Sequence, residues 1–282
     1  MQLGLGRATL TRNNHWADLM GREIRLLVRA DDAGSSWSSN IGCLRSCTDG
    51  IARSVEVMMP CPWTSHAATL FNAQPDIDIG IHLTLTSEWN GVKWRPITQA
   101  KSLTDEHGNF LPLLVPREGD PRSSLAQAAW SIDEVTHEFR SQVALGVSLF
   151  PNASHISSHM LRHFKDFDPR LGDVISDLCT DYGLADDAFG HGLARIEGYP
   201  KFPRTTQRRV DAFVQQLKAL EPGTYIFIDH PAVASPELSA TGHVGYEDVA
   251  DDRETCLETL TSSAVRECVD QLGLELISYR DL

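Results

Sequence analysis

The fold class is decided by the stretch Ile24-Arg25-Leu26-Leu27-Val28-Arg29-Ala30-Asp31-Asp32-Ala33-Gly34. Its first seven residues are largely apolar, as is typical of a buried strand, and two acids follow directly. A Ser-rich turn and a helical pattern from Ser39 to Gly50 come next. The same order returns with strands at 54–59 and 77–83 and a helix at 65–72. This alternation predicts an α/β fold with a parallel sheet.

The rest of the chain continues the alternation. Helices are predicted at 131–147, 168–182, 211–220 and 252–272, and strands within 151–163, 223–231 and 274–279. Because polar groups follow several strands, we expect a barrel with its site at the carboxyl ends of the strands. A doubly wound open sheet is the alternative, but the glycine-rich dinucleotide-binding pattern does not follow the first strand.

The length of 282 residues fits either one large barrel or two domains. We predict one barrel domain over residues 22–282, preceded by a polar arm at 1–21 that lacks periodicity and is expected to be disordered. With 25 Lys and Arg against 38 Asp and Glu, the net charge of -13 offers no basic surface for nucleic acid or an anionic membrane. A small neutral or cationic molecule such as a sugar fits an acidic protein better.

The cysteines bear on the cellular compartment. All six stand apart without a CxxC pair, which predicts reduced thiols rather than disulfides or a thiolate metal site. No secretory signal pattern is found, and no uncharged apolar run approaches the ~18 residues that cross a bilayer. We therefore expect a cytoplasmic protein with no membrane partner.

Adjacent acids at the end of an apolar strand are the first candidate for chemistry. Asp31 and Asp32 repel each other and lose hydration unless a cation or a proton offsets them. If one carboxylate binds a divalent ion, the other can act as a general base toward water, as hydrolysis requires. The alternative is a loop that only caps the next helix.

Histidines supply the second candidate. His82 ends the third predicted strand, and His155, His159 and His163 are spaced four apart. Along either a helix or a strand this spacing puts side chains on one face, so the three can converge. Neutral imidazoles are common ligands of divalent metals. The alternatives are a core histidine at His82 and a solvated cluster at the other three positions.

Further candidates lie later in the chain and in the irregular segment 84–122. His230 follows an apolar strand and can protonate a leaving group, whereas Asp229 beside it should point to the other face. Arg253 can anchor a site carboxylate, or form a surface ion pair. Trp89 and Trp94 suggest an ordered, sugar-sized lid, because long irregular loops in compact domains are usually functional or disordered.

In this order and spacing the motifs resemble those of the YdjC-type carbohydrate deacetylases, a family that includes chitooligosaccharide deacetylases. The resemblance covers about residues 26–279 and rests on these motifs: Ala30-Asp31-Asp32-Ala33-Gly34, Gly80-Ile81-His82-Leu83-Thr84-Leu85, the run from His155 to His163, Asp229-His230-Pro231, Arg253-Glu254 and Leu276-Ile277-Ser278-Tyr279. It implies a variant (β/α) barrel similar to that of the polysaccharide deacetylases. It also implies a metal-dependent hydrolase that deacetylates an N-acetylated amino sugar or short oligosaccharide.

The resemblance also implies roles for individual residues. Asp32, His82 and His159 would hold one divalent metal ion. Asp31 would be the general base and His230 the acid that protonates the leaving amine. Trp89, Trp94 and Arg253 are expected to contact the sugar substrate.

The chain departs from the family pattern His-x-Asp-Ser-His-x-His-x-His. Ser157 stands at the aspartate and Leu161 at the middle histidine, while Ala33 and Ala232 replace a usual phenylalanine and glycine. Losing a carboxylate beside a metal ligand commonly weakens metal affinity or activity. Two alternatives therefore stay open: a non-catalytic carbohydrate-binding protein with a degenerate metal site, and a metal-dependent hydrolase of another amide or ester.

The metal and the partners are less sharply defined. Zn and Mg are the first candidates, with Mn, Co and Ni as others; the Asp/His/His set suits Zn, Mn, Co or Ni, whereas Mg prefers more oxygen ligands. The expected partner is a small sugar substrate. Apolar residues on the helix at 252–272 can face either the barrel or a second subunit, which leaves a homodimer open.

Overall fold

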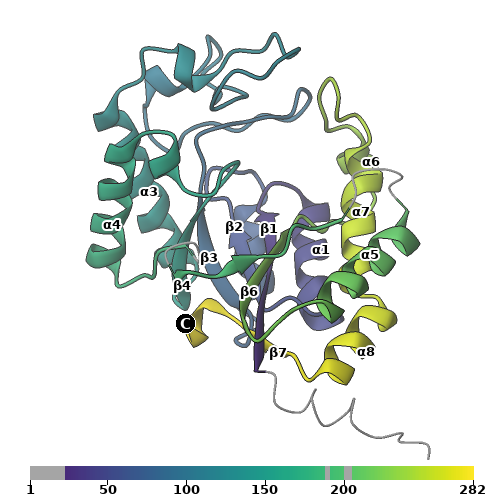
Figure 1. Ribbon diagram of the computed structural model, residues 1–282. Helices are drawn as coiled ribbons and strands as arrows, with labels where there is room; N and C mark the ends of the chain where they lie inside the picture. The colour runs from purple at the N-terminus through teal and green to yellow at the C-terminus, as the bar shows by residue number, and fades with distance from the viewer. Residues whose placement is uncertain (1–22, 188–190, 200–204) are drawn as a thin grey trace, which may run out of the picture.

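The computed structural model describes residues 23–187, 191–199 and 205–282 (Figure 1). The arm predicted at 1–21 lies outside the described residues. Within them, the strands are β1 (Ile24–Ala33), β2 (Ser54–Val57), β3 (Asp78–Leu83), β4 (Ala153–Ser158), β5 (Ala194–Arg195), β6 (Gly223–Asp229) and β7 (Glu275–Ile277). The α-helices are α1 (Trp37–Thr48), α2 (Thr64–Phe71), α3 (Ile132–Leu149), α4 (Pro169–Tyr182), α5 (Thr206–Lys218), α6 (Pro236–Ser239), α7 (Val249–Leu260) and α8 (Ser263–Leu272).

The sheet is parallel throughout its described pairs and has the order β4-β3-β2-β1-β6-β5. β6 runs along one edge of β1, and the other edge pairs first with β7 and then with β2. No pairing joins the two end strands, β4 and β5, in the described part of the chain. The predicted α/β fold is confirmed, in the form of a curled, open variant of the barrel.

Helix boundaries follow the expected local signals in several places. In α4, the Asp168 side chain accepts a hydrogen bond from the backbone N–H of Arg170, Pro169 occupies the first turn, and Gly183 ends the helix at φ 66°. Figure 1 shows α3 and α4 on the left of the view, beside β3 and β4, and α1, α5, α7 and α8 together on the right.

The long helix predicted at 252–272 is wrong, because two helices occupy this stretch. α7 ends at Leu260, whose carbonyl oxygen accepts a hydrogen bond from the Ile51 N–H at 3.3 Å, and α8 starts after extended Ser262. Most apolar side chains of both helices are buried within the chain, where α7 packs on α1 and α5, and α8 packs on α5. The homodimer stays a prediction.

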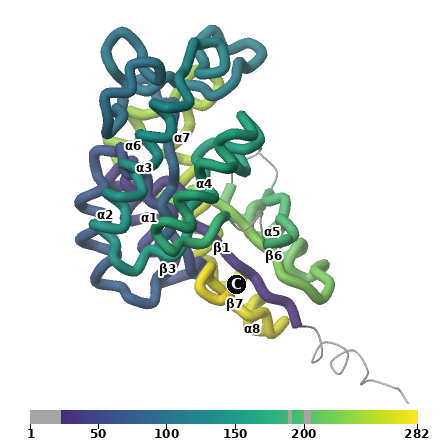
Figure 2. Tube along the Cα trace, turned by 90° about the vertical axis from the view of Figure 1, so that its left-hand side faces the viewer, coloured from purple at the N-terminus to yellow at the C-terminus, as the bar shows by residue number. Residues whose placement is uncertain are grey.

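The irregular segment that follows β3 crosses the same end of the molecule as the carboxyl ends of the strands (Figures 1 and 2). Between β3 and α3 its described regular structure is limited to two short 3₁₀ helices, Lys101–Leu103 and Leu125–Gln127. No helix among the described residues is both long and apolar enough to span a membrane.

Candidate active site

A β-bulge at the end of β1 brings both adjacent acids to one place. Ala30 pairs with Val55 and Ala33 with Val57, so three steps along β1 face two along β2. Asp32 takes a φ of 70°, a left-handed conformation that aspartate tolerates better than most residues. Adjacent side chains of a regular strand point to opposite faces, but here Asp31 and Asp32 both line one pocket.

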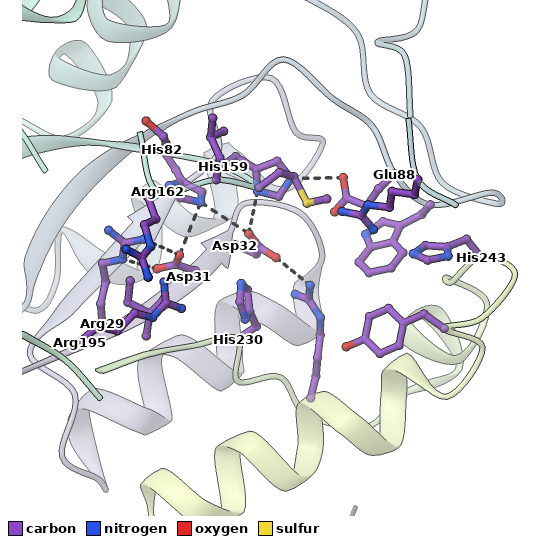
Figure 3. Close-up of a pocket in the computed structure, with 18 residues that line it drawn as sticks. Arg29, Asp31, Asp32, His82, Glu88, His159, Arg162, Arg195, His230 and His243 are labelled. Atoms are coloured by element: carbon purple, nitrogen blue, oxygen red, sulfur yellow. Dashed lines mark hydrogen bonds and ion pairs between the residues drawn. The ribbon is translucent and has the colours of Figure 1, made fainter. Parts of the chain in front are cut away.

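Asp32 meets two histidines from neighbouring strands (Figure 3). His82 lies on β3, and His159 follows β4. The backbone N–H of His159 donates a hydrogen bond to the Leu83 carbonyl oxygen at 2.9 Å. Asp32 Oδ1 lies 3.2 Å from His159 Nδ1 and 3.8 Å from His82 Nε2. One ligand atom from each of the three lies within 4.8 Å of the others, so a single metal ion can be reached by all three.

The chemistry of these three residues fits a divalent cation. Asp32 Oδ2 accepts a hydrogen bond from Arg253 at 2.7 Å, but the buried Oδ1 has no hydrogen-bond partner. Leaving a buried carboxylate oxygen unsatisfied is costly, and this oxygen faces two imidazoles. One carboxylate and two imidazoles form the ligand set of a catalytic metal site with open positions.

The electrostatics of the cluster also favour positive charge at this point. Burial would lower the pKa of His159, but Glu88, 3.2 Å from its Nε2, and Asp32 raise that pKa to about 10. Burial and the neighbouring His159 hold the pKa of His82 well below its usual range. The pKa of Asp32 is well below its usual range, because Arg253 and His159 outweigh burial. A metal cation bound here would compete with the proton of His159.

Asp31 sits next to the three candidate ligands and is clamped by an arginine. Arg29 Nε and Nη2 donate to its two carboxylate oxygens at 2.7 and 2.8 Å. Burial raises the pKa of Asp31 to about 6, in spite of Arg29 and His230, which act in the opposite direction. A carboxylate with a pKa close to neutral is suited to accept a proton during hydrolysis.

His230 follows β6 and lines the same pocket. Its backbone N–H donates to Asp229 Oδ1 at 2.9 Å, and the other Asp229 oxygen accepts a hydrogen bond from the Tyr199 hydroxyl. Asp229 thus accepts hydrogen bonds from the His230 backbone and from a tyrosine. This fits the prediction that Asp229 does not orient the His230 imidazole. The pocket has a volume of about 420 Å³, which lies in the range of small-molecule sites.

The residues expected to contact substrate separate into two groups. Trp89 lines the pocket, with its ring 6.0 Å from that of His243 and 5.2 Å from the Arg253 guanidinium. Arg253 also lines it and is buried, so the surface ion pair considered for it is excluded. The expectation for Trp94 is corrected: it is 2% exposed, lies outside the pocket, and donates its indole N–H to the Thr86 carbonyl at 2.7 Å.

The three histidines spaced four apart do not converge on one site. β4 ends at Ser158 and the chain turns at Met160, which has a φ of 70°, so the strand geometry does not persist through the run. His155 instead contacts Glu56 at 2.6 Å inside the sheet. His163 accepts from the Lys165 N–H at 3.0 Å and faces Asp186 at 3.1 Å.

Three charged residues around the site, Arg29, Glu56 and Glu88, were not predicted from the sequence. Glu56 and Arg29 each interrupt an apolar strand, and a charge in a buried strand needs a partner, so this signal was available. Glu88 lies in the irregular segment without a comparable signal, 71 residues from the histidine it contacts.

Known proteins similar to this chain indicate its family. The family model described as YdjC-like protein matches residues 25–271. A carbohydrate deacetylase of Clostridium beijerinckii is 27% identical, with 92% of this chain and 100% of the relative covered. A chitooligosaccharide deacetylase of Yersinia enterocolitica is 29% identical, with 91% and 98% covered.

One solved structure supports the fold. A crystal structure from Enterococcus faecalis V583, of a protein named for a proposed role in cellobiose-phosphate cleavage, superposes with a TM-score of 0.72. The two chains are 21% identical, and the match covers 92% of this chain and 98% of the other. At this identity the likeness concerns the fold alone.

Proposed function

The chain belongs to the YdjC-like protein family, and on that premise we propose that it is a metal-dependent carbohydrate deacetylase. Its substrate would be an N-acetylated amino sugar or a short oligosaccharide, and its reaction the hydrolysis of the acetamide to acetate and a free amine. The observation that carries the proposal is the buried Asp32 Oδ1, which accepts no hydrogen bond and lies 3.2 and 3.8 Å from nitrogens of two buried histidines, with Asp31 alongside. The relatives named carbohydrate deacetylases support the reaction.

Three residues would hold the cation: Asp32, His82 and His159. When bound, the cation would act as a Lewis acid that polarises the acetamide carbonyl. The two imidazoles in this set favour Zn, Mn, Co or Ni over Mg. Arg253 holds the second oxygen of Asp32 and so leaves Oδ1 directed at the histidines.

The remaining residues would move protons. Asp31 would take a proton from the attacking water while the oxygen of that water bonds to the carbonyl carbon. His230 would give a proton to the nitrogen as the C–N bond breaks. Trp89 would contact the sugar ring from the wall of the pocket.

Acetate release tests the proposal. Metal-stripped protein is reloaded with Zn, Mn, Co, Ni or Mg and incubated with N-acetylglucosamine and short chitooligosaccharides. We expect release with at least one ion, and a fall of about 10²–10⁴-fold in kcat in Asp31→Asn and His230→Ala with little change in KM. Sugar binding without turnover, unchanged in Asp31→Asn, would favour the carbohydrate-binding alternative. Acetate release only from ester substrates would favour the other hydrolase.

We also propose that the protein works in the cytoplasm. All six cysteines are free thiols, as in proteins of reducing compartments. To test this location, the protein is expressed in bacterial cells, the cells are separated into cytoplasmic and periplasmic fractions, and the protein is detected in each fraction with an antibody.

A further inference from the structure

A buried serine on β4 connects the candidate ligand His82 on β3 to a carboxylate on β2. Ser157 Oγ lies 2.7 Å from His82 Nδ1 and donates a short hydrogen bond to Glu56 Oε2. Glu56 is on β2, His82 on β3 and Ser157 on β4, and each is at most 1% exposed. The contact is therefore sealed from the solvent.

Gly80 makes this reach across β3 possible. It pairs with Glu56 on one side and with His155 on the other. A Cβ at this position would lie 2.1 Å from Glu56 Oε2 and 2.3 Å from His155 Nε2. Because position 80 has no side chain, the Glu56 carboxylate can pass over β3 and meet the side chains of β4.

The hydrogen bonds assign the proton on His82. A carboxylate only accepts, and burial of Glu56 is outweighed by His155 and Arg29, which hold its pKa well below the usual range. The single hydroxyl proton of Ser157 therefore goes to Glu56. Ser157 Oγ must then accept from His82, so Nδ1 carries the imidazole proton. A neutral imidazole has one N–H, which leaves the lone pair of Nε2 free on the side of Asp32.

We propose that Ser157 and Glu56 are positioning residues, which together fix His82 in the Nδ1–H tautomer with Nε2 available to a metal ion. The inference rests on the proposed function for its cation. The family pattern has an aspartate where this chain has Ser157, and the structure supplies a carboxylate through the serine hydroxyl instead. In this chain the carboxylate that reaches His82 through position 157 is therefore that of Glu56.

A purely structural role for Ser157 would leave the tautomer and the metal affinity unchanged. The test therefore uses the full chain in four forms: wild type, Ser157→Ala, Ser157→Thr and the double variant Glu56→Gln/Ser157→Asp. Two readouts are taken on each. Long-range ¹H–¹⁵N spectra give the tautomer of His82 in metal-free protein, and calorimetric titration with Zn and Mn gives the Kd.

Ser157→Ala should lose the Nδ1–H tautomer as the dominant form and bind the cation about 10–100-fold more weakly. Ser157→Thr keeps the hydroxyl and should stay within about threefold of wild type. The double variant returns a carboxylate to position 157 and should recover most of the affinity that Ser157→Ala loses. Ser157→Ala removes a single oxygen atom, so we expect the variant to fold. Urea unfolding curves check this.

The outcome separates this inference from the proposed function. If Ser157→Ala keeps both the wild-type tautomer and the wild-type Kd, the positioning role is wrong. If the tautomer and the Kd change as expected but no sugar releases acetate in wild type, the positioning role stands and the deacetylase fails. Wild type that binds no cation would overturn the metal-positioning role, whatever the spectra show.

Discussion

Two buried polar clusters share this sheet, and they differ in how completely their charges are paired. The pocket cluster, consisting of Asp31, Asp32, His82, Glu88, His159 and Arg253, opens into the cavity and contains a carboxylate oxygen that accepts no hydrogen bond. The sealed cluster, consisting of Glu56, His155, Ser157, Asp187 and Tyr279, lies inside the fold, and none of its side-chain oxygen or nitrogen atoms is left without a hydrogen bond. Arg29 contacts both, since it donates to Asp31 in one and to Asp187 and Tyr279 in the other.

The difference indicates what each cluster does. A buried charge that is fully paired stabilises one arrangement of the chain, and removing one partner exposes the other to an uncompensated cost. A buried oxygen without a donor is costly in the folded protein and becomes favourable only when something else binds it. We therefore expect substitutions in the sealed cluster to act mainly on the free energy of unfolding, except at Ser157, which also contacts His82 and so affects the metal. Substitutions in the pocket cluster should act mainly on ligand binding.

Gly80→Ala should have the largest effect, and it should fall on stability. The new Cβ would lie within 2.3 Å of both Glu56 and His155, which have no room to move apart without breaking their contact. We expect the free energy of unfolding to fall by about 3 kcal/mol, measured by urea denaturation. Gly172→Ala is the matched control: its Cβ would meet only the Lys165 side chain, at 3.0 Å, and the change should stay below about 1 kcal/mol. Equal losses in both variants would show that the sealed cluster is not tightly packed around position 80.

Acid should weaken the sealed cluster through Glu56. Its pKa is lower in the folded protein than in the unfolded chain, so its contribution is complete above the unfolded value of about 4.3 and is lost as the pH falls toward the folded value. At pH 7, Glu56→Gln should be less stable than wild type by about 2 kcal/mol, and this gap should narrow below about pH 4.5. Urea denaturation between pH 3 and 7 measures it.

The control for the acid experiment is Glu275→Gln. Glu275 pairs with Arg25 at the surface, 3.2 Å away, and such exposed pairs contribute little. Its unfolding free energy should stay within about 1 kcal/mol of wild type at every pH. A gap for Glu56→Gln that does not narrow in acid would mean that the charge of Glu56 contributes nothing to stability.

Arg253→Lys tests the pocket cluster, and its effect should fall on metal binding. Arg253 directs Asp32 by a 2.7 Å hydrogen bond while its guanidinium lies over the Trp89 ring, a geometry that an ammonium group does not reproduce. We expect the Kd for the preferred cation to rise about tenfold, measured by calorimetry. Arg25→Lys, on the surface, should leave the Kd unchanged. A larger loss of stability than of affinity in Arg253→Lys would contradict the division between the clusters.

The sequence predicts the fold better than it predicts either cluster. Apolar runs and helical spacing are local properties, so most strands and helices fall close to their predicted positions. The break after Leu260 was missed because apolar residues keep helical spacing across it, although Ser262 precedes the second helix. The strand ends that carry Asp32, His82 and His159 were predictable for the same reason: carboxyl ends of parallel strands meet at one edge.

What the sequence could not supply is how individual side chains are aimed. The bulge that turns Asp31 and Asp32 to one pocket depends on the register between β1 and β2, which no residue pattern specifies. The contact between Glu56 and Ser157 spans 101 residues and needs Gly80 between them. The prediction that the three histidines converge failed because it assumed a regular helix or strand through the run. The chain instead turns at Met160.

The two tryptophans of the irregular segment give the smallest expected effect and extend the comparison beyond the charged clusters. Trp94 is a core residue, and Trp94→Phe loses a hydrogen bond to the Thr86 carbonyl, so stability should fall by about 1 kcal/mol while KM for an N-acetylated sugar stays within about twofold. Trp89 lines the pocket, and Trp89→Phe should raise KM severalfold with a smaller loss of stability. Steady-state kinetics gives KM, and urea denaturation gives the stability of both variants. An equal rise in KM would mean that the irregular segment moves as a unit and that lining the pocket does not determine which tryptophan contacts the sugar.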